Sequence, residues 1–290
     1  MLPLAAYRAA IALDEPFRPS AAPADRPAEQ VRSALGLLAA DPAAVRLGLR
    51  DLGDVDATTA RRALRALLTV RAPGPLPGGA AEAVDAVLGA ERALRPTVPA
   101  RQLPTIAPES PVSLWRGDIT ALAVDAIVNA ANSALLGCFQ PLHACIDNAI
   151  HNAAGPRLRD DCATVMTLRG SPEPTGTAKI TRGYHLPARY VLHTVGPVID
   201  GRPSASDAEA LASSYRSCLD LAAEVETIRT LALCAVSTGV FGYPRDEAAP
   251  VALRTVTDWL GAHPGRFDRI VFTVFGENDE TAYRRALDAS

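Results

Sequence analysis

Lysine is almost absent from this chain of 290 residues. Lys179 is the single lysine, and arginine supplies the rest of the 29 basic residues. Acidic residues number 32, so the formal net charge is −3, which argues against a broad attraction to nucleic acid or to an anionic membrane surface. We therefore expect neither nucleic acid nor membrane as a partner. An anionic ligand would have to be held by local features, such as backbone amides or a metal.

Long apolar runs are missing as well. No stretch approaches the roughly eighteen consecutive apolar residues of a membrane-spanning helix. The first eight residues lack a basic segment followed by a long apolar one, so a secretory signal is not expected. The five cysteines are an odd number, which favours reduced thiols over a disulfide framework. We expect a cytoplasmic monomer.

The first hundred residues contain neither cysteine nor histidine and are rich in alanine, leucine and arginine. Apolar residues recur there at helical spacing between prolines; the clearest stripes are Val31, Leu35 and Leu38, then Leu64, Leu67 and Leu68, then Val84, Val87 and Leu88. Residues 56–59 read Asp-Ala-Thr-Thr, which suits the N-terminal cap of the second helix. These stripes favour a core over a partner-binding face. We predict a helical region and linker over residues 1–105 and a second domain over 106–290.

Short β-rich runs alternate with helical stretches after about residue 110. The expected strands lie near residues 113–116, 126–128, 178–181, 190–195, 230–236 and 269–274, and the helical stretches near 145–153, 206–224, 246–261 and 278–288. The last three strands are almost continuous apolar runs, which is typical of strands buried on both faces. The alternation predicts a three-layer α/β fold with helices on both faces of a mainly parallel sheet.

The most informative segment is residues 137–148, which read Gly-Cys-Phe-Gln-Pro-Leu-His-Ala-Cys-Ile-Asp-Asn. Cys138, His143 and Cys145 combine two thiols and an imidazole, the ligand types that Zn²⁺ prefers. Three protein ligands leave a fourth position for water or substrate, which is typical of a catalytic metal. The competing interpretation is two buried thiols and a capping histidine. Asp147 is then either a helix cap or an acid–base group beside the metal.

Two other loops follow expected strands, where sheets of this kind bind ligands. Asn129 and Asn132 could offer donors and acceptors to sugar hydroxyls, although asparagine also caps turns. Residues 237–244 read Ser-Thr-Gly-Val-Phe-Gly-Tyr-Pro, and successive amides ahead of a helix can bind a diphosphate without lysine. A glycine turn after a strand is common, so this loop alone does not identify a ligand.

The remaining thiols and imidazoles lie in settings that favour the core over chemistry. Cys162, Cys218 and Cys234 fall in apolar helix-like or strand-like segments, and His193 falls in a buried strand. His151 lies outside the ligand spacing, and His185 precedes a strand without a clear role.

Five ordered motifs resemble those of macrodomains, from about residue 110 to the end of the chain. They are residues 117–120 (Gly-Asp-Ile-Thr), 124–132 (Val-Asp-Ala-Ile-Val-Asn-Ala-Ala-Asn), 150–155 (Ile-His-Asn-Ala-Ala-Gly), 193–197 (His-Thr-Val-Gly-Pro) and 237–244. Many members of the family have a glycine-rich loop followed by Val-Asp-Gly. Here the segment with the three metal ligands replaces most of the glycines, and Ile146-Asp147-Asn148 replaces Val-Asp-Gly. This departure resembles the zinc-dependent branch, which also carries an N-terminal helical extension.

The resemblance implies a site for ADP-ribose. By position, Asp118 would accept from the adenine amino group with Ile119 beside it, and Asn132 would hold the distal ribose. Around these, Asn129, Gly176 and Thr177 would border the ribose pocket, and Ser237, Thr238, Gly239, Val240 and Phe241 would cradle the diphosphate. Phe275 would flank the adenine or else be a core aromatic.

The resulting prediction is a zinc-dependent hydrolase that removes mono-ADP-ribose from protein side chains, with ADP-ribose and the modified protein as partners. The Zn²⁺ would polarise the distal ribose or lower the pKa of a bound water. Asp147 would orient or deprotonate that water, and Asn132 would fix the ribose for attack. The alternatives are an ADP-ribose-binding reader, a deacetylase of O-acetyl-ADP-ribose, and a purely structural zinc.

Overall fold

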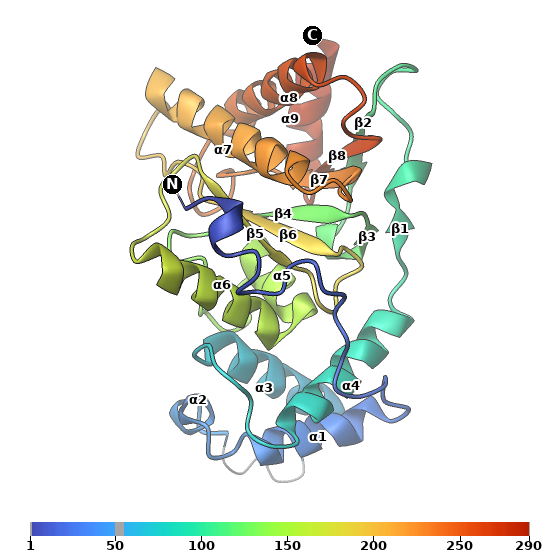
Figure 1. Ribbon diagram of the computed structural model, residues 1–290, viewed down its shortest axis with the longest axis vertical. Helices are drawn as coiled ribbons and strands as arrows, with labels where there is room; N and C mark the ends of the chain where they lie inside the picture. The colour runs from blue at the N-terminus through green and yellow to red at the C-terminus, as the bar shows by residue number, and fades with distance from the viewer. Residues whose placement is uncertain (1, 50–54, 290) are drawn as a thin grey trace.

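The computed structural model describes residues 2–49 and 55–289. Its centre is a six-stranded sheet in the order β2-β8-β7-β4-β6-β5 (Figure 1). The strands are β2 (Val112–Arg116), β4 (Ala126–Ala130), β5 (Ala178–Arg182), β6 (Tyr190–Thr194), β7 (Thr230–Cys234) and β8 (Arg269–Val274). Neighbouring strands are parallel except β5, which runs antiparallel to β6. The predicted mainly parallel sheet is confirmed, and antiparallel β5 makes it a mixed sheet. A separate parallel pair is formed by β1 (Val98–Pro99) and β3 (Leu122–Ala123).

Helices cover both faces of the sheet and give the predicted three layers (Figure 1). One face carries α7 (Ala205–Ala223), α8 (Arg245–Ala262) and α9 (Glu277–Asp288), and the other carries α5 (Ile146–Ala154) and α6 (Pro156–Arg169). Helix α6 was not among the predicted helices, although Pro156 at its first position and left-handed Gly170 after its end are both boundary signals. In the described part of the chain, each helix is too short or too polar to span a bilayer.

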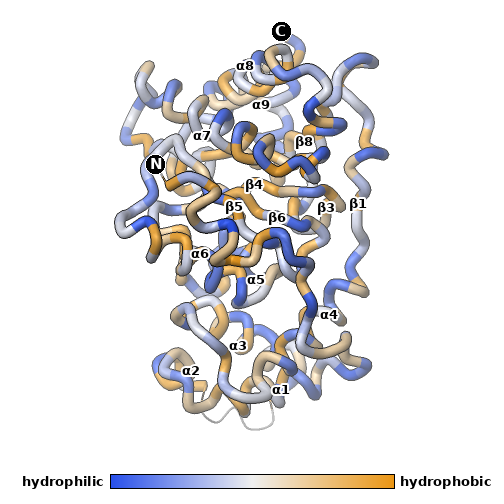
Figure 2. Tube along the Cα trace, in the orientation of Figure 1, coloured by the Kyte–Doolittle hydropathy of each residue, from blue (hydrophilic) through white to orange (hydrophobic). Residues whose placement is uncertain are grey.

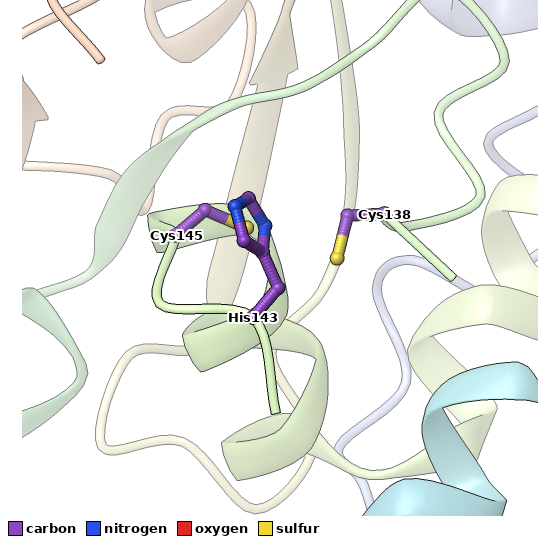
Figure 3. A group of neighbouring side chains, drawn as sticks. All are labelled: Cys138, His143 and Cys145. Atoms are coloured by element: carbon purple, nitrogen blue, oxygen red, sulfur yellow. The ribbon is translucent and has the colours of Figure 1, made fainter. Parts of the chain in front are cut away.

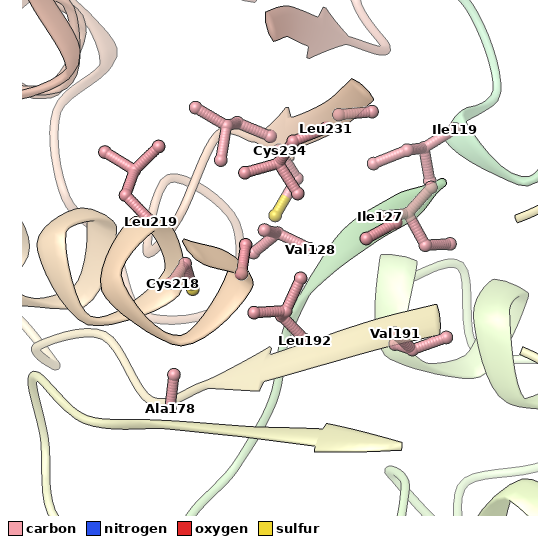
Figure 4. Close-up of a cluster of buried hydrophobic side chains, with 14 of the residues drawn as sticks. Ile119, Ile127, Val128, Ala178, Val191, Leu192, Cys218, Leu219, Leu231 and Cys234 are labelled. Carbon is pink, nitrogen blue, oxygen red and sulfur yellow. The ribbon is translucent and has the colours of Figure 1, made fainter. Parts of the chain in front are cut away.

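The main core lies between the sheet and its helices. Strands β6 and β7 are buried at each position, and β8 is buried at each position except Arg269. Strands covered on both faces explain the continuous apolar runs in the sequence, which Figure 2 shows gathered at the centre. Figure 4 shows Cys218 and Cys234 packed among aliphatic side chains of this core. Cys162 is buried in a smaller cluster, so the prediction that these three cysteines are core residues is confirmed.

Four N-terminal helices form a second apolar core of their own. They are α1 (Pro27–Leu37), α2 (Pro42–Arg46), α3 (Ala57–Val70) and α4 (Ala80–Leu94), here called the helical unit. Each of the three predicted stripes contributes buried residues to it. Asp56 caps α3, because its Oδ1 accepts from the backbone N–H groups of Thr58 (2.9 Å) and Thr59 (3.0 Å). The unit stacks beyond α5 and α6, on the side away from the sheet (Figure 1).

The segment before the helical unit packs against the sheet instead. Leu4, Tyr7, Ile11 and Leu13 are buried in the main core. The Tyr7 hydroxyl accepts from the backbone N–H of Ile180 at 3.1 Å, and so covers a donor on the edge strand β5. No sequence pattern indicated this docking. The division between residues 1–105 and 106–290 stays a prediction.

Candidate functional site

The predicted metal ligands come together at the start of α5. One ligand atom each from Cys138, His143 and Cys145 lies within 4.8 Å of the other two (Figure 3). Zinc bonds of about 2.0–2.3 Å bring ligand atoms to within about 4 Å of one another, so small side-chain rotations would close the cluster on an ion. All three residues are half-buried, which leaves an approach for a fourth ligand. His143 Nδ1 is buried and has no hydrogen-bond partner in the described part of the chain. The donor set and this unpaired nitrogen both fit Zn²⁺.

Asp147 lies in the first turn of α5, two residues beyond Cys145. Its Oδ1 accepts from Asn129 Nδ2 at 2.8 Å, and His151 Nε2 lies 3.4 Å from the same oxygen. Burial raises the pKa of Asp147 to about 6, although the Asn129 hydrogen bond and the charge of Arg159 oppose the shift. The carboxylate of Asp147 is favoured at the N-terminus of α5, which agrees with the predicted capping role. Asp147 is also two residues from the predicted ligand Cys145, so the acid–base role stays a prediction.

Asn129 lies beneath the site, in contrast to the predicted contact with a ligand. The residue is fully buried in β4, and its Nδ2 lies 3.2 Å from His193 Nδ1 as well as 2.8 Å from Asp147. His193 Nε2 lies 2.9 Å from Thr181 Oγ1, so both of its ring nitrogens have partners. Burial lowers the pKa of His193 to about 3 and keeps the imidazole neutral. His193 is therefore the core histidine that the sequence indicated, and Asn129 suits the positioning of Asp147.

Buried His151, Cys162 and His193 form a second group whose potential ligand atoms lie within 4.8 Å of one another. Because His193 is already bonded on both nitrogens, we interpret this group as a polar layer of the core. His185 belongs to neither group, and its Nε2 lies 3.0 Å from Asp85 Oδ1 on the helical unit.

Asn132 follows β4 and lies beside the ligand-bearing loop. Its Nδ2 donates to the carbonyl of Gly137 at 3.0 Å, and its Oδ1 accepts from the backbone N–H of Ala134 at 3.0 Å. The residue is half-buried, as are the three predicted metal ligands. The turn-capping interpretation of Asn132 is thus observed, and its predicted ribose contact stays a prediction.

Residues 237–241 lie between β7 and the helix α8, and several of their backbone amides have no backbone partner among the described residues. The backbone N–H groups of Ser237, Gly239, Val240 and Phe241 donate to no backbone carbonyl in the described residues. Ser237 has a left-handed backbone, φ 65°, and its buried hydroxyl has no partner there either. The loop is closed by Gly242 N–H to Gly239 O at 3.1 Å. Such a row of amides ahead of a helix is suited to bind an anion such as a phosphate.

The predicted adenine end holds a carboxylate that already has partners. Asp118 Oδ1 accepts from the backbone N–H of Thr120 at 2.9 Å, and Oδ2 is paired with Arg95 at the end of α4. Ile119 beside it is buried. Phe275 follows β8 and is 81% exposed, so the alternative that it is a core aromatic was wrong. The adenine contacts of Asp118 and Phe275 stay predictions.

Gly176 and Thr177 lie just before β5, and their predicted place at the border of the ribose pocket stays a prediction. Gly176 has φ 83°, and its carbonyl accepts from Ser213 Oγ (2.9 Å) and Ser217 Oγ (2.7 Å). The Thr177 hydroxyl donates to the Pro174 carbonyl at 2.8 Å and to Glu173 Oε1 at 2.5 Å. Both residues are buried, and these bonds fix the backbone that leads into β5.

This arrangement has known relatives. The sequence model of the Macro domain matches residues 128–252. The crystal structure of the Trypanosoma brucei macrodomain in complex with ADP-ribose is 39% identical, with a TM-score of 0.59, over 67% of this chain and 78% of that chain. The chain belongs to the macro domain family.

This macrodomain is also similar to proteins named Protein-ADP-ribose hydrolase. The relative from Treponema medium is 54% identical over 174 residues, and the one from Staphylococcus aureus (strain MRSA252) is 48% identical over 178 residues. The matched regions cover 60% and 61% of this chain and 66% of each relative. The macrodomain therefore spans just under two thirds of their length.

Two buried polar side chains of the macrodomain, Arg159 and Lys179, were not predicted from the sequence. Arg159 on α6 reaches the carbonyl of Leu136 beside the ligand cluster, Nε to O 2.7 Å. The single lysine, Lys179, is buried and donates to Glu173 Oε1 at 2.7 Å. An arginine in an unpredicted helix and a lysine in a strand carry no sequence signal that distinguishes them from surface residues. Recognising α6 from Pro156 and Gly170 would have placed Arg159 near the site.

Proposed function

We propose that this macrodomain removes mono-ADP-ribose from modified protein side chains with a Zn²⁺ ion held by Cys138, His143 and Cys145. The observation that carries the proposal is the gathering of two thiols and an imidazole beside Asn132 and Asp147, in the loop that follows β4. The names of the relatives at 54% and 48% identity support the same activity. The bound ADP-ribose in the T. brucei structure supports the ligand class.

Different residues of the pocket would bind the diphosphate, the adenine and the distal ribose of ADP-ribose. The free amides of residues 237–241 suit the diphosphate, which explains how an acidic chain with one lysine binds an anion. Asp118 would accept from the adenine amino group at one end, with exposed Phe275 available to stack on the ring. Asn132, on the loop that carries the metal ligands, would hold the distal ribose hydroxyls at the other end.

The cleaved bond would lie between the ligand cluster and Asp147. A Zn²⁺ ion bound there would supply Lewis acidity towards the ribose or a water. Asn129 holds one carboxylate oxygen of Asp147 at 2.8 Å, which leaves the other oxygen to orient a water and to accept its proton. Asn132 would fix the ribose so that the water attacks in line.

The test is to incubate the purified macrodomain with proteins that carry mono-ADP-ribose on Asp or Glu, on Ser, or on Arg, and to measure free ADP-ribose. We expect release from at least one linkage, and the comparison identifies it. A reader would bind ADP-ribose in calorimetry without releasing it, and a deacetylase would act on O-acetyl-ADP-ribose alone. Either result would overturn the proposal.

The amide loop gives a separate prediction for the pocket. A Cβ added at Gly196 would lie 2.1 Å from Ser237 Oγ and 2.6 Å from Val236 Cγ1. Gly196→Ala would therefore push the loop aside at a cost of about 1–3 kcal/mol, and we expect roughly tenfold weaker ADP-ribose binding by calorimetry.

Ser237→Gly offers a matched rescue of that variant. It removes the nearer clash and suits the left-handed backbone at this position, φ 65°. The double variant should recover part of the affinity. Unchanged binding by Gly196→Ala alone would exclude this loop from the binding site.

We also propose that the protein acts in the cytoplasm as a monomer. All five cysteines are free, which suits a reducing compartment. Sedimentation of the purified protein would test the monomer.

A further inference from the structure

The segment that carries the metal ligands, residues 136–145, has an unusual backbone. Phe139 and Leu142 are left-handed, with φ 51° and 60°, and Leu135 just before the segment has φ 57°. Non-glycine residues in this conformation cost of order 1–3 kcal/mol each and persist only where the surroundings hold them. This segment, here called the metal loop, therefore needs support from outside itself.

Arg159 of α6 supports the first half of the metal loop. Its Nε donates to the Leu136 carbonyl at 2.7 Å, and its guanidinium lies 4.5 Å from the centre of the Phe139 ring. The side chain is buried, with 5% of the residue exposed. Within the described residues it forms no ion pair with a carboxylate.

The other N–H groups of Arg159 bind the end of α3 in the helical unit. Nη1 donates to the carbonyls of Leu68 (2.7 Å) and Arg71 (2.8 Å), and Nη2 donates to the carbonyl of Thr69 (2.9 Å). Carbonyls in the last turn of a helix have no partner inside the helix and carry the negative end of its dipole. One guanidinium thus satisfies the end of α3 and the start of the metal loop together.

Asn148 supports the second half of the metal loop. Its Nδ2 donates to the carbonyls of His143 (2.9 Å) and Gln140 (3.2 Å). Asn152 Nδ2 lies 2.6 Å from Asn148 Oδ1 and 3.3 Å from Thr69 Oγ1. The last turn of α3 therefore reaches both halves of the loop, through Arg159 on one side and through the two asparagines on the other.

We propose that the helical unit is a brace that holds the metal loop in its ligand-binding form, with Arg159 as the positioning residue between them. The inference rests on the proposed function only in that the loop binds Zn²⁺. It assigns a role to α3, which lies about 70 residues before the ligands in sequence and contributes no ligand itself. Groups that orient metal ligands from outside typically change metal affinity by about 10–100-fold.

The test compares two arginines of the same helix in the full-length protein. Arg157 lies roughly 200° around α6 from Arg159, and it binds Asp85 and Ser20, away from the metal loop. Both arginines thus contact residues that precede the macrodomain motifs, but only Arg159 contacts the metal loop. Zn²⁺ affinity is measured by competition with a chelator, and the visible spectrum of the Co²⁺-loaded protein reports tetrahedral thiolate ligation.

We expect Arg159→Gln to bind Zn²⁺ about 10–100-fold more weakly and to show an altered Co²⁺ spectrum. Arg157→Gln should match the wild type in both measurements. Arg159→Lys keeps the charge but loses the fixed fork of N–H groups, so it should also weaken binding. Thermal unfolding of each apo variant establishes that it is folded.

Wild-type Zn²⁺ affinity in folded Arg159→Gln would overturn the brace and leave the proposed zinc dependence intact. Absence of Zn²⁺ binding by the wild-type protein would overturn both. If Arg159→Gln does not fold, Arg159→Lys and Thr69→Val decide the question. Thr69→Val removes the hydroxyl contacts with Asn148 and Asn152 and keeps the backbone carbonyl that Arg159 binds. Unchanged affinity in both of these variants would also contradict the proposal.

Discussion

His143→Ala will reduce the release of ADP-ribose from a modified protein by about 10³-fold or more. The substitution removes one of three protein ligands, and two thiolates alone form an incomplete site for Zn²⁺. Metal-ion catalysis supplies several kcal/mol of transition-state stabilisation, and each 1.36 kcal/mol corresponds to a factor of ten in rate. Initial rates and the zinc content of the same preparation are the two measurements. ADP-ribose affinity should fall less than the rate, because the amides of residues 237–241 are untouched.

The matched control for this loss is His263→Ala. His263 is an exposed histidine at the end of α8, stacked on Trp259. The variant should keep both metal and rate. Cys138→Ser is a cleaner second ligand variant than Cys145→Ser, because Cys145 Sγ also accepts from the Asn148 N–H at the start of α5. If zinc-free His143→Ala protein released ADP-ribose at the wild-type rate, the proposed metal mechanism would be contradicted.

The largest effect on stability is expected from Lys179→Met, which should lower the free energy of unfolding by about 3 kcal/mol. Lys179 and Glu173 form a buried ion pair with side chains 1% and 0% exposed, Nζ to Oε1 2.7 Å. Removing one partner leaves an uncompensated buried charge, at a cost of about 3–5 kcal/mol. Arg169 Nε lies 3.0 Å from the other carboxylate oxygen and would offset part of this cost. Urea unfolding of the two proteins provides the measurement.

A double variant separates the charge from the packing. Lys179→Met with Glu173→Gln removes the unpaired carboxylate and should regain part of the lost stability. The backbone N–H of Glu173 donates to the Ser133 carbonyl at 2.8 Å, directly after Asn132, so loss of the pair should also loosen the predicted ribose end of the site. Equal stability of Lys179→Met and the wild type would contradict the expected cost of breaking this buried ion pair.

Local patterns predicted what depends on local structure. The apolar runs near residues 190–195, 230–236 and 269–274 matched β6, β7 and β8, because strands buried on both faces leave no polar position. The Asp56 cap of α3 could also be predicted, because its hydrogen-bond partners are only two and three residues away. The gathering of Cys138, His143 and Cys145 followed from their spacing within eight residues.

The parts that could not be predicted depend on contacts between distant residues. Arg159 meets carbonyls 88–91 positions earlier in the chain, and no periodicity encodes such a contact. Asn129 was placed at the ligand surface because an asparagine beside a strand end suggests exposure, whereas its amide is buried against Asp147 and His193. The ion pair between Arg95 and Asp118 could not be predicted for the same reason, because the two residues come from separate parts of the fold.

The burial of Lys179 has a practical consequence for measurements on this protein. An amine-reactive acylating reagent meets a single ε-amino group in the whole sequence, and that group is enclosed together with Glu173. Its modification must wait for the surrounding structure to open. The rate of acylation at this position, followed by mass spectrometry, would therefore report how often the folded molecule opens around Lys179, without any introduced probe.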